Sequence, residues 1–373
     1  MKKIFLILLV VLLTASGAWA GSPIIRVGLL KNVTAAEISG AGVFEVSFSK
    51  SDQTSYFNHP IAIKIKDKAL FVETKKISSD KVTVRTDNSV VLVNKRNYRG
   101  FIEIINNAPQ SFTVVEIVPM DQYVYGIIKH EISPTWPPEA IKAQIIVART
   151  YALKNMGKHA KDGFDMCTTT DCQVYGGMDS EDPVSNKLVD ETPGEILTYK
   201  GELISTPYHG FCGGYTEEAR YVWEGSIKVP YLVSKRCKFC KNAPHFNWQA
   251  RYERSKIESI LQANGYDIGK IINIKVNERS PSGRAMEMKI SHKNGKLLLQ
   301  ANKFRLLMGS DIIRSALFKI RKDKDAYIFE GTGWGHGVGM CQEGAKGMAE
   351  KGYDYSKILK FYYPGTQITQ WDY

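Results

Sequence analysis

The chain has 373 residues, 43% of them hydrophobic, which excludes an intrinsically disordered protein and gives room for one large domain or two to three modules. Its formal net charge of +12 suits an anionic polymer such as cell wall or phospholipid head groups, although solubility alone also explains such a charge. Six cysteines are too few for a small fold held together by disulfides.

The first twenty residues predict a secretory signal peptide. Lys2 and Lys3 give a positive start, residues 4–13 form an apolar run too short to span a bilayer, and residues 18–20 match a cleavage site. Retention of this segment as a membrane anchor is the alternative. We therefore expect an exported protein of the periplasm, cell wall or extracellular space, with no nucleic-acid partner and no transmembrane segment after signal cleavage.

Residues 24–118 predict a small β module. Short runs in this region alternate between apolar and polar side chains with a period of two, and turn residues separate the runs. The predicted strands are 24–30, 43–48, 61–66, 81–85, 90–93, 101–105 and 112–118.

The pattern changes to helical spacing at Met120, and helices are predicted over 120–131 and 138–156. Further strands are predicted at 196–199, 202–205, 271–277, 285–291, 296–300, 318–322 and 326–330. Further helices are predicted at 255–264, 302–309 with an Asn302 cap, 344–351 and 355–362. This interleaving predicts an α+β fold in which the β module packs with a mixed α/β core over residues 119–370.

Glu131 is the first candidate for chemistry. It ends an apolar helix face and precedes Ile132-Ser133-Pro134, a helix-ending sequence. Desolvation at such a position would hold the carboxyl proton to higher pH, as a general acid requires. From the local sequence alone, a surface glutamate at a helix end is the favoured alternative.

Two glycine-rich segments carry histidines. In residues 333–342 the glycines let the backbone approach a ligand, His336 could donate to a sugar or act as acid or base, and Trp334 could stack on a sugar face. A purely structural loop is the alternative, and a P-loop is excluded because no Lys-Ser/Thr follows the glycines. The second segment is 209–216, where we expect His209 to project from a strand end.

The cysteines of the exported chain predict disulfides, a metal site, or both. Cys237 and Cys240 form a C-x-x-C pair, and with His209 and Cys212 they could bind zinc. An oxidising compartment favours disulfides over zinc. Redox catalysis is disfavoured because no thioredoxin-like βαβ unit surrounds the C-x-x-C.

In their order along residues 24–370, these motifs resemble the SpoIID/LytB family of cell-wall proteins. The stretches that carry the resemblance are Ile25-Arg26-Val27, Tyr98-Arg99-Gly100, Met120 to Gly126 leading to Glu131, Pro138 to Gln144, Ala148 to Ala152, Cys172 to Tyr175, His209 with Gly213 to Thr216, Pro230-Tyr231-Leu232, Gly333 to Met340 with Gln342, and Tyr362 to Gly365. So many ordered matches are more specific than any single motif.

The resemblance implies a function. SpoIID-like members are lytic transglycosylases that cleave peptidoglycan glycan strands and prefer strands stripped of stem peptides, whereas LytB-like members enhance cell-wall amidases. The family's catalytic glutamate falls on Glu131, which reverses the local preference for a surface role. The resemblance thus implies cleavage between N-acetylmuramic acid and N-acetylglucosamine to 1,6-anhydro products, with no required cofactor. The substrate-binding candidates are His209, Trp334, His336, Gln342 and Arg149, the last with a buried structural role as its alternative.

A non-catalytic glycan-binding protein that enhances a cell-wall amidase is the alternative function. The retained Glu131 favours the enzyme, because a binding module needs no acid there. An exported zinc-dependent hydrolase is a third hypothesis, but the chain lacks an H-E-x-x-H or similar signature.

Some members of the family hold a structural zinc through cysteines and histidines that precede a Gln-x-Tyr motif. Cys167 and Cys172 match this region, but Asp171 stands where a histidine would, so a disulfide stays open beside zinc. Cys212 and Cys341 also replace the family's usual residues. They either pair with each other or complete a site particular to this protein.

Overall fold

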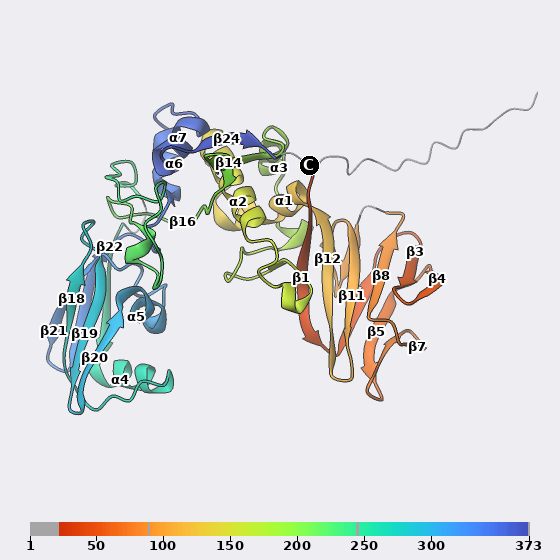
Figure 1. Cartoon of the computed structure of the whole chain (residues 1–373), viewed down its shortest axis with the longest axis horizontal. Helices are drawn as coiled ribbons and strands as arrows, with labels where there is room; N and C mark the ends of the chain where they lie inside the picture. Colours follow the sequence, from red (N-terminus) through yellow and green to blue (C-terminus); the bar gives the residue numbers. More distant parts are fainter. Residues whose placement is uncertain (1–21, 89, 244–245, 372–373) are drawn as a thin grey trace, which may run out of the picture.

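The computed structural model describes residues 22–88, 90–243 and 246–371, so the predicted signal peptide at 1–20 lies outside the described residues. The fold is α+β, as predicted. Figure 1 shows a β module at one end, a helical core in the middle and a second module, residues 247–332, at the other end.

The described part of the N-terminal module consists of two sheets. One contains β1 (Ile24–Val33), β3 (Phe44–Phe48), β4 (Ser51–Phe57), β8 (Lys81–Thr86), β11 (Phe101–Asn107), β12 (Ser111–Pro119) and β13 (Met166–Cys167), in the order β13-β1-β12-β11-β8-β3-β4. The other contains β2 (Ala35–Ser39), β5 (Ile61–Lys66), β6 (Ala69–Val72), β7 (Lys75–Ile77), β9 (Val91–Val93) and β10 (Arg96–Tyr98), in the order β10-β9-β2-β5-β6-β7. Alternate side chains such as Phe44, Val46 and Phe48 point inward, so both sheets share one hydrophobic cluster.

The helical core begins with α1 (Met120–Glu131) and α2 (Pro138–Lys154), close to the predicted bounds. Its other elements are α3 (Pro183–Asp190), β14 (Glu195–Tyr199), β15 (Glu202–Leu203), β16 (Tyr208–His209), β23 (Met340–Cys341), α6 (Gln342–Ala349), α7 (Tyr355–Tyr362) and β24 (Gln367–Gln370). Helix α2 contacts α1, α3, α6 and α7, which is why it is buried on nearly all sides. Short 3-10 helices lie at Ala160–Asp162, Gly177–Ser180 and Ala219–Tyr221. No helix in the described part of the chain is both long and apolar enough to cross a bilayer.

The 247–332 module has a hydrophobic cluster of its own. It contains β17 (Asn247–Glu253), α4 (Arg254–Ala263), β18 (Ile271–Arg279), β19 (Ala285–His292), β20 (Gly295–Gln300), α5 (Ala301–Met308), β21 (Phe318–Asp323) and β22 (Ala326–Thr332). Its strands pair as β17-β22-β21 and β18-β19-β20. The predicted Asn302 cap is wrong, because β20 runs directly into α5 and puts Gln300 at the N-cap.

Candidate active site

Glu131 is the last residue of α1. Pro134 disfavours helical geometry at Ser133, the residue before it, and Ile132 is already extended. The helix therefore ends at Glu131. Ile127 and Ile128 lie one turn earlier on the same face and are fully buried. The apolar face therefore carries Glu131 to the edge of the core, where its side chain is half-buried.

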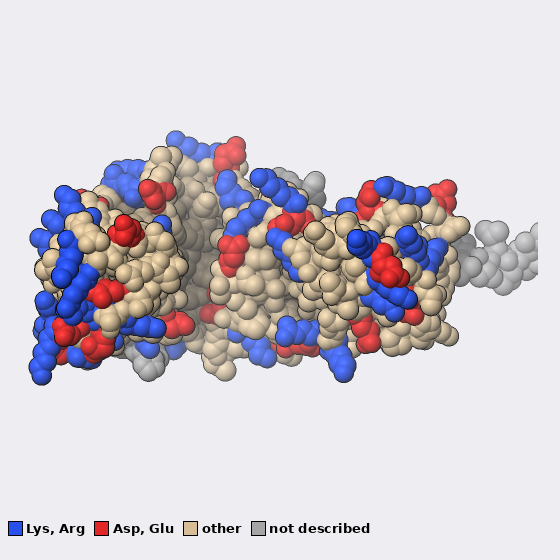
Figure 2. Space-filling model, turned by 90° about the horizontal axis from the view of Figure 1, so that it is seen from below, with Lys and Arg blue, Asp and Glu red and all other residues tan. Residues whose placement is uncertain are grey.

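A cavity of about 580 Å³ opens beside this carboxyl, and we call it the Glu131 cavity. Its lining residues are His130, Glu131, Tyr151, Thr170, Cys172, Gln173, Val174, Pro207, Tyr208, Trp223 and His336. Glu131 supplies the only carboxyl among these described residues. Figure 2 shows the surface deeply hollowed between the helical core and the 247–332 module.

Burial raises the pKa of Glu131 above its ordinary value, and hydrogen bonds with Tyr208 and Gln342 act in the opposite direction. The Gln342 amide also donates from Nε2 to the main-chain oxygen of Glu131 at 3.3 Å and to Oε1 of Gln144 at 3.4 Å. Burial raises the pKa of the Tyr208 hydroxyl well above its usual value, so this hydroxyl keeps its proton as a donor. The carboxyl thus has a raised pKa and two fixed partners.

The two predicted histidines lie side by side, with ring centroids 5.4 Å apart. Nδ1 of His336 accepts from the Val338 N–H at 3.0 Å, which puts the proton of the neutral ring on Nε2. Burial lowers the pKa of His336 to about 3, so its ring is neutral. His336 therefore suits a hydrogen-bond donor better than an acid at the cavity wall.

His209 lies behind that wall and is 4% exposed. Its Nδ1 donates to the Val338 carbonyl at 3.1 Å, and burial lowers its pKa well below the usual value. The remaining ring atom, Nε2, has no hydrogen-bond partner among the described atoms. His209 does not line the Glu131 cavity, so its substrate-binding role stays a prediction.

Trp334 and Arg149 also lie outside the residues that line the cavity. The Trp334 ring packs edge-on against Phe211, with centroids 6.4 Å apart. Arg149 is 1% exposed, and its guanidinium donates to Asp121 Oδ1 at 2.7 Å and to the Glu195 carbonyl at 2.9 Å. These contacts match the structural alternative predicted for Arg149.

Several residues of the cavity were not predicted from the sequence as functional. Tyr208 contacts Glu131, and Gln173 donates from Nε2 to the Tyr208 hydroxyl at 3.5 Å. Trp223 packs on His336 with ring centroids 5.0 Å apart. Only Gln173 carried a signal, because it belongs to the Gln-x-Tyr motif.

The six cysteines form two clusters, and no disulfide bond joins any two of these described residues. The ligand atoms of Cys212, Cys237, Cys240 and Cys341 lie within 4.8 Å of one another. His209 is absent from this set, which corrects the predicted Cys₃His combination. Strand β16 pairs in parallel with β23 and aligns His209 with Cys341, and it is the cysteine that joins the cluster.

The second cluster joins His159 and Asp171 to the predicted pair Cys167 and Cys172, again within 4.8 Å. Strand β13, which pairs with β1, holds Cys167 in place. His159 follows α2 and was not predicted, because it lies thirteen positions before Cys172 along the chain.

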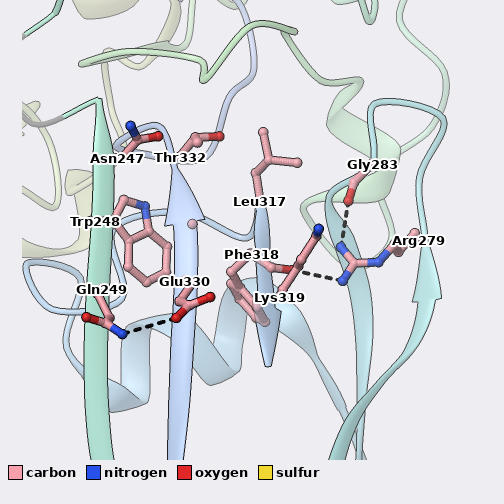
Figure 3. Close-up of a pocket in the computed structure, with 11 residues that line it drawn as sticks. Asn247, Trp248, Gln249, Arg279, Gly283, Leu317, Phe318, Lys319, Glu330 and Thr332 are labelled. Carbon is pink, nitrogen blue, oxygen red and sulfur yellow. Dashed lines mark hydrogen bonds between the residues drawn. The ribbon is translucent and has the colours of Figure 1, made fainter. Parts of the chain in front are cut away.

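A larger cavity of about 810 Å³ lies on the 247–332 module (Figure 3). Some of its polar groups are bound to one another, and Gln249 donates to Glu330 at 3.1 Å, but the buried Nε1 of Trp248 has no hydrogen-bond partner among the described atoms. Arg279 donates to the carbonyl oxygens of Gly283 at 2.7 Å and Phe318 at 2.8 Å. We therefore assign the candidate active site to the Glu131 cavity, where the carboxyl is desolvated.

Together the fold and the cavity define an α+β protein in which one desolvated carboxyl, that of Glu131, stands among the described residues that line the cavity. Residues 108–199 match the family model described as stage II sporulation protein, SpoIID. Residues 218–339 match a domain of unknown function, DUF8618, which encloses the 247–332 module.

Relatives extend the match over most of the chain. An uncharacterized protein of Brachyspira hyodysenteriae is 36% identical over 260 residues, which are 69% of each chain. The stage II sporulation protein D of Bacillus subtilis is 30% identical over 73% of this chain and 79% of its own length. The amidase enhancer of the same organism is 31% identical over 66% of this chain but only 40% of its own length. The chain belongs to the SpoIID family.

Proposed function

We propose that the protein is a peptidoglycan lytic transglycosylase. Its substrate would be glycan strands stripped of stem peptides, cleaved between N-acetylmuramic acid and N-acetylglucosamine. The observation that carries this proposal is Glu131, a carboxyl with a raised pKa and no second carboxyl among the described residues that line its cavity. Most glycosidases need two carboxyl groups, whereas a reaction whose nucleophile belongs to the substrate needs one.

In the proposed reaction, protonated Glu131 gives its proton to the glycosidic oxygen as the bond to muramic C1 breaks. The resulting carboxylate then takes the proton of the muramic C6 hydroxyl, whose oxygen bonds to C1. Atoms balance without water, and the product carries a 1,6-anhydro ring. Holding the hydroxyl next to C1 supplies the effective concentration that replaces a second catalytic group.

The residues around Glu131 support this division of labour. Tyr208 and Gln342 hold the carboxyl, and neutral His336 could donate to a sugar oxygen from the cavity wall. Tyr151 and Trp223 offer aromatic faces to sugar rings. We assign His209, Trp334 and Arg149, which do not line the cavity, a supporting role.

The cavity's neighbours support a polymeric substrate. A cavity of about 460 Å³ shares Tyr151, Pro207 and Trp223 with the Glu131 cavity. Another, of about 480 Å³, shares Trp223 and lies against the 247–332 module. Three adjoining cavities along Trp223 would accommodate several consecutive sugars of a strand.

A zinc ion in the second cysteine cluster is part of the proposal. Its donors are two sulfurs, one imidazole nitrogen and one carboxylate oxygen, a set that zinc accepts, and Asp162 lies 3.6 Å from the other nitrogen of His159. His159, Cys167, Asp171 and Cys172 would hold the ion, which would supply structural bracing because Cys172 lines the Glu131 cavity.

Export to the cell wall, with the predicted signal peptide removed, completes the proposal. The net charge of +12 suits an anionic wall. A second candidate function is enhancement of a cell-wall amidase, because one relative is named an amidase enhancer.

The test is digestion of purified glycan strands, with and without stem peptides, followed by mass spectrometry. We expect 1,6-anhydro ends on stripped strands and a yield that Glu131→Gln lowers by about 10²–10⁴-fold. Absence of such ends, or equal yield from the variant, would reject the transglycosylase. Amidase stimulation that survives Glu131→Gln would then favour the second candidate.

A further inference from the structure

We propose that Cys212, Cys237, Cys240 and Cys341 bind one zinc ion in a buried tetrathiolate site, separate from the cluster at 159–172. The four residues are 0–1% exposed. They come from the loop after β16, from residues 237–240 and from the N-cap of α6. The site does not depend on the proposed function.

The distances between the sulfur atoms fit one shared ion. All four lie within 4.8 Å of one another, and those of Cys212 and Cys240 are 3.5 Å apart. Zinc–sulfur bonds of about 2.3 Å in a tetrahedron place the sulfurs roughly 3.8 Å apart. A disulfide bond joins only two sulfurs, at about 2.05 Å, and does not by itself explain the convergence of four.

Donors already surround the sulfurs as thiolates require. Cys341 Sγ accepts from the main-chain N–H groups of Cys212 at 3.2 Å and Gly344 at 3.3 Å. The Tyr362 hydroxyl lies 3.3 Å from Cys237 Sγ and can donate to it. Such outer contacts orient metal ligands and offset their negative charge.

A buried guanidinium offsets part of the charge of the site. Four thiolates and Zn²⁺ sum to a charge of −2, which a buried environment accepts only with compensation. Arg284 is 2% exposed and donates to the carbonyl oxygens of Cys212 and, at 2.8 Å, of Tyr215. This guanidinium belongs to the 247–332 module, so the ion would also tie that module electrostatically to the core.

Glycine at position 344 keeps the space beside the sulfurs open. A Cβ atom there would lie 3.0 Å from Cys237 Sγ and 3.1 Å from Cys341 Sγ, besides clashing with the Tyr362 hydroxyl. Zinc binding would replace the thiol protons by four Zn–S bonds and release those protons to solvent.

The ion would fix two contacts of Glu131. Gln342 immediately follows Cys341, and Tyr208 lies four positions before Cys212. Both neighbours hydrogen-bond the Glu131 carboxyl. The tetrathiolate site would therefore position Tyr208 and Gln342 beside Glu131, besides stabilising the fold by linking its cysteine-bearing segments.

The first experiment uses the unaltered protein. Inductively coupled plasma mass spectrometry measures the metal, and alkylation after denaturation in chelator without reductant counts the thiols. We expect zinc and six alkylated cysteines. Resistance to alkylation until reduction at any of Cys212, Cys237, Cys240 and Cys341, located by peptide mass spectrometry, or iron instead of zinc, would overturn the assignment.

The second experiment separates the two clusters. Cys167→Ser should keep one zinc, whose X-ray absorption spectrum shows only sulfur neighbours at about 2.3 Å. Cys341→Ser should lose one equivalent relative to the unaltered protein. Nitrogen or oxygen neighbours in the first variant, or an unchanged zinc content in the second, would contradict the proposal.

Discussion

At Glu131, burial and hydrogen bonding pull the pKa in opposite directions, and burial dominates. A glutamate whose folded pKa is raised holds its proton more tightly in the folded state than in the unfolded chain. The contribution of Glu131 to stability is therefore greatest below the ordinary pKa of 4.5 and falls as pH rises toward the folded value. The feature that suits Glu131 to act as an acid thus costs stability near neutrality.

Glu131→Gln should remove this cost. We expect the variant to melt higher than the unaltered protein at pH 7, by roughly 2 °C, with an advantage that shrinks toward pH 4.5. Calorimetry across this range checks it, with exposed Glu202→Gln as the matched control. An advantage that grows on acidification would contradict a raised pKa.

Substitution of Arg149 distinguishes a structural role of this residue from a role in substrate binding. Arg149→Met should lower the free energy of unfolding by roughly 2–3 kcal/mol, because Asp121 and the Glu195 carbonyl lose their partner. Urea denaturation measures this loss, and KM for glycan should stay within about twofold. A large rise in KM with unchanged stability would instead indicate contact with the substrate.

Sequence reasoning found the carboxyl but only part of its surroundings. Glu131, His336 and Gln342 sit in motifs that a single chain reveals. Tyr208 and Trp223 do not, because their positions depend on how distant segments fold around the cavity. The cysteine clusters were incomplete for the same reason: His159 was not predicted, and Cys341 was linked only to Cys212 and not to Cys237 and Cys240.

At the scale of elements, most helices were predicted well, whereas several strands were missed, including the seven-residue strands β4 and β17. Helices α1 and α7 match their predicted bounds. The two-residue strands β13, β16 and β23 carry no periodicity, and only their pairing partners define them. These short strands nevertheless position Cys167, Tyr208 and Cys341.

Trp223 lines all three adjoining cavities and follows the 3-10 helix at Ala219–Tyr221. Its substitution therefore tests whether this segment contacts the substrate. Trp223→Ala should raise KM for long glycan strands by about tenfold, equivalent to about 1.4 kcal/mol of lost stacking, whereas Trp223→Phe should retain most binding. Steady-state kinetics on strands of defined length check this. An unchanged KM for Trp223→Ala would exclude the segment from the substrate path.

At the scale of the molecule, the α+β class was predictable, but the separate core of the 247–332 module was not. Its strands and helices have the same periodicity as those of the rest of the chain, and only the packing separates its hydrophobic cluster. Figure 2 shows Lys and Arg side chains along the end of the molecule that this module forms.

The basic surface predicts salt-dependent attachment to the wall. Between 0.1 and 1 M NaCl the Debye length falls from about 10 to about 3 Å, so binding to purified cell-wall sacculi should weaken at least several-fold. Sedimentation of the Glu131→Gln variant, which should leave the polymer intact, measures this. Salt-independent binding would show that contacts other than charge hold the protein.

The most direct test of the central claim is digestion of stripped glycan strands in H₂¹⁸O, followed by mass spectrometry of the new ends. The account predicts 1,6-anhydro ends without ¹⁸O, and their loss in Glu131→Gln, because the C6 hydroxyl and not water attacks C1. New reducing ends that carry ¹⁸O would mean that water is the nucleophile and would contradict the account.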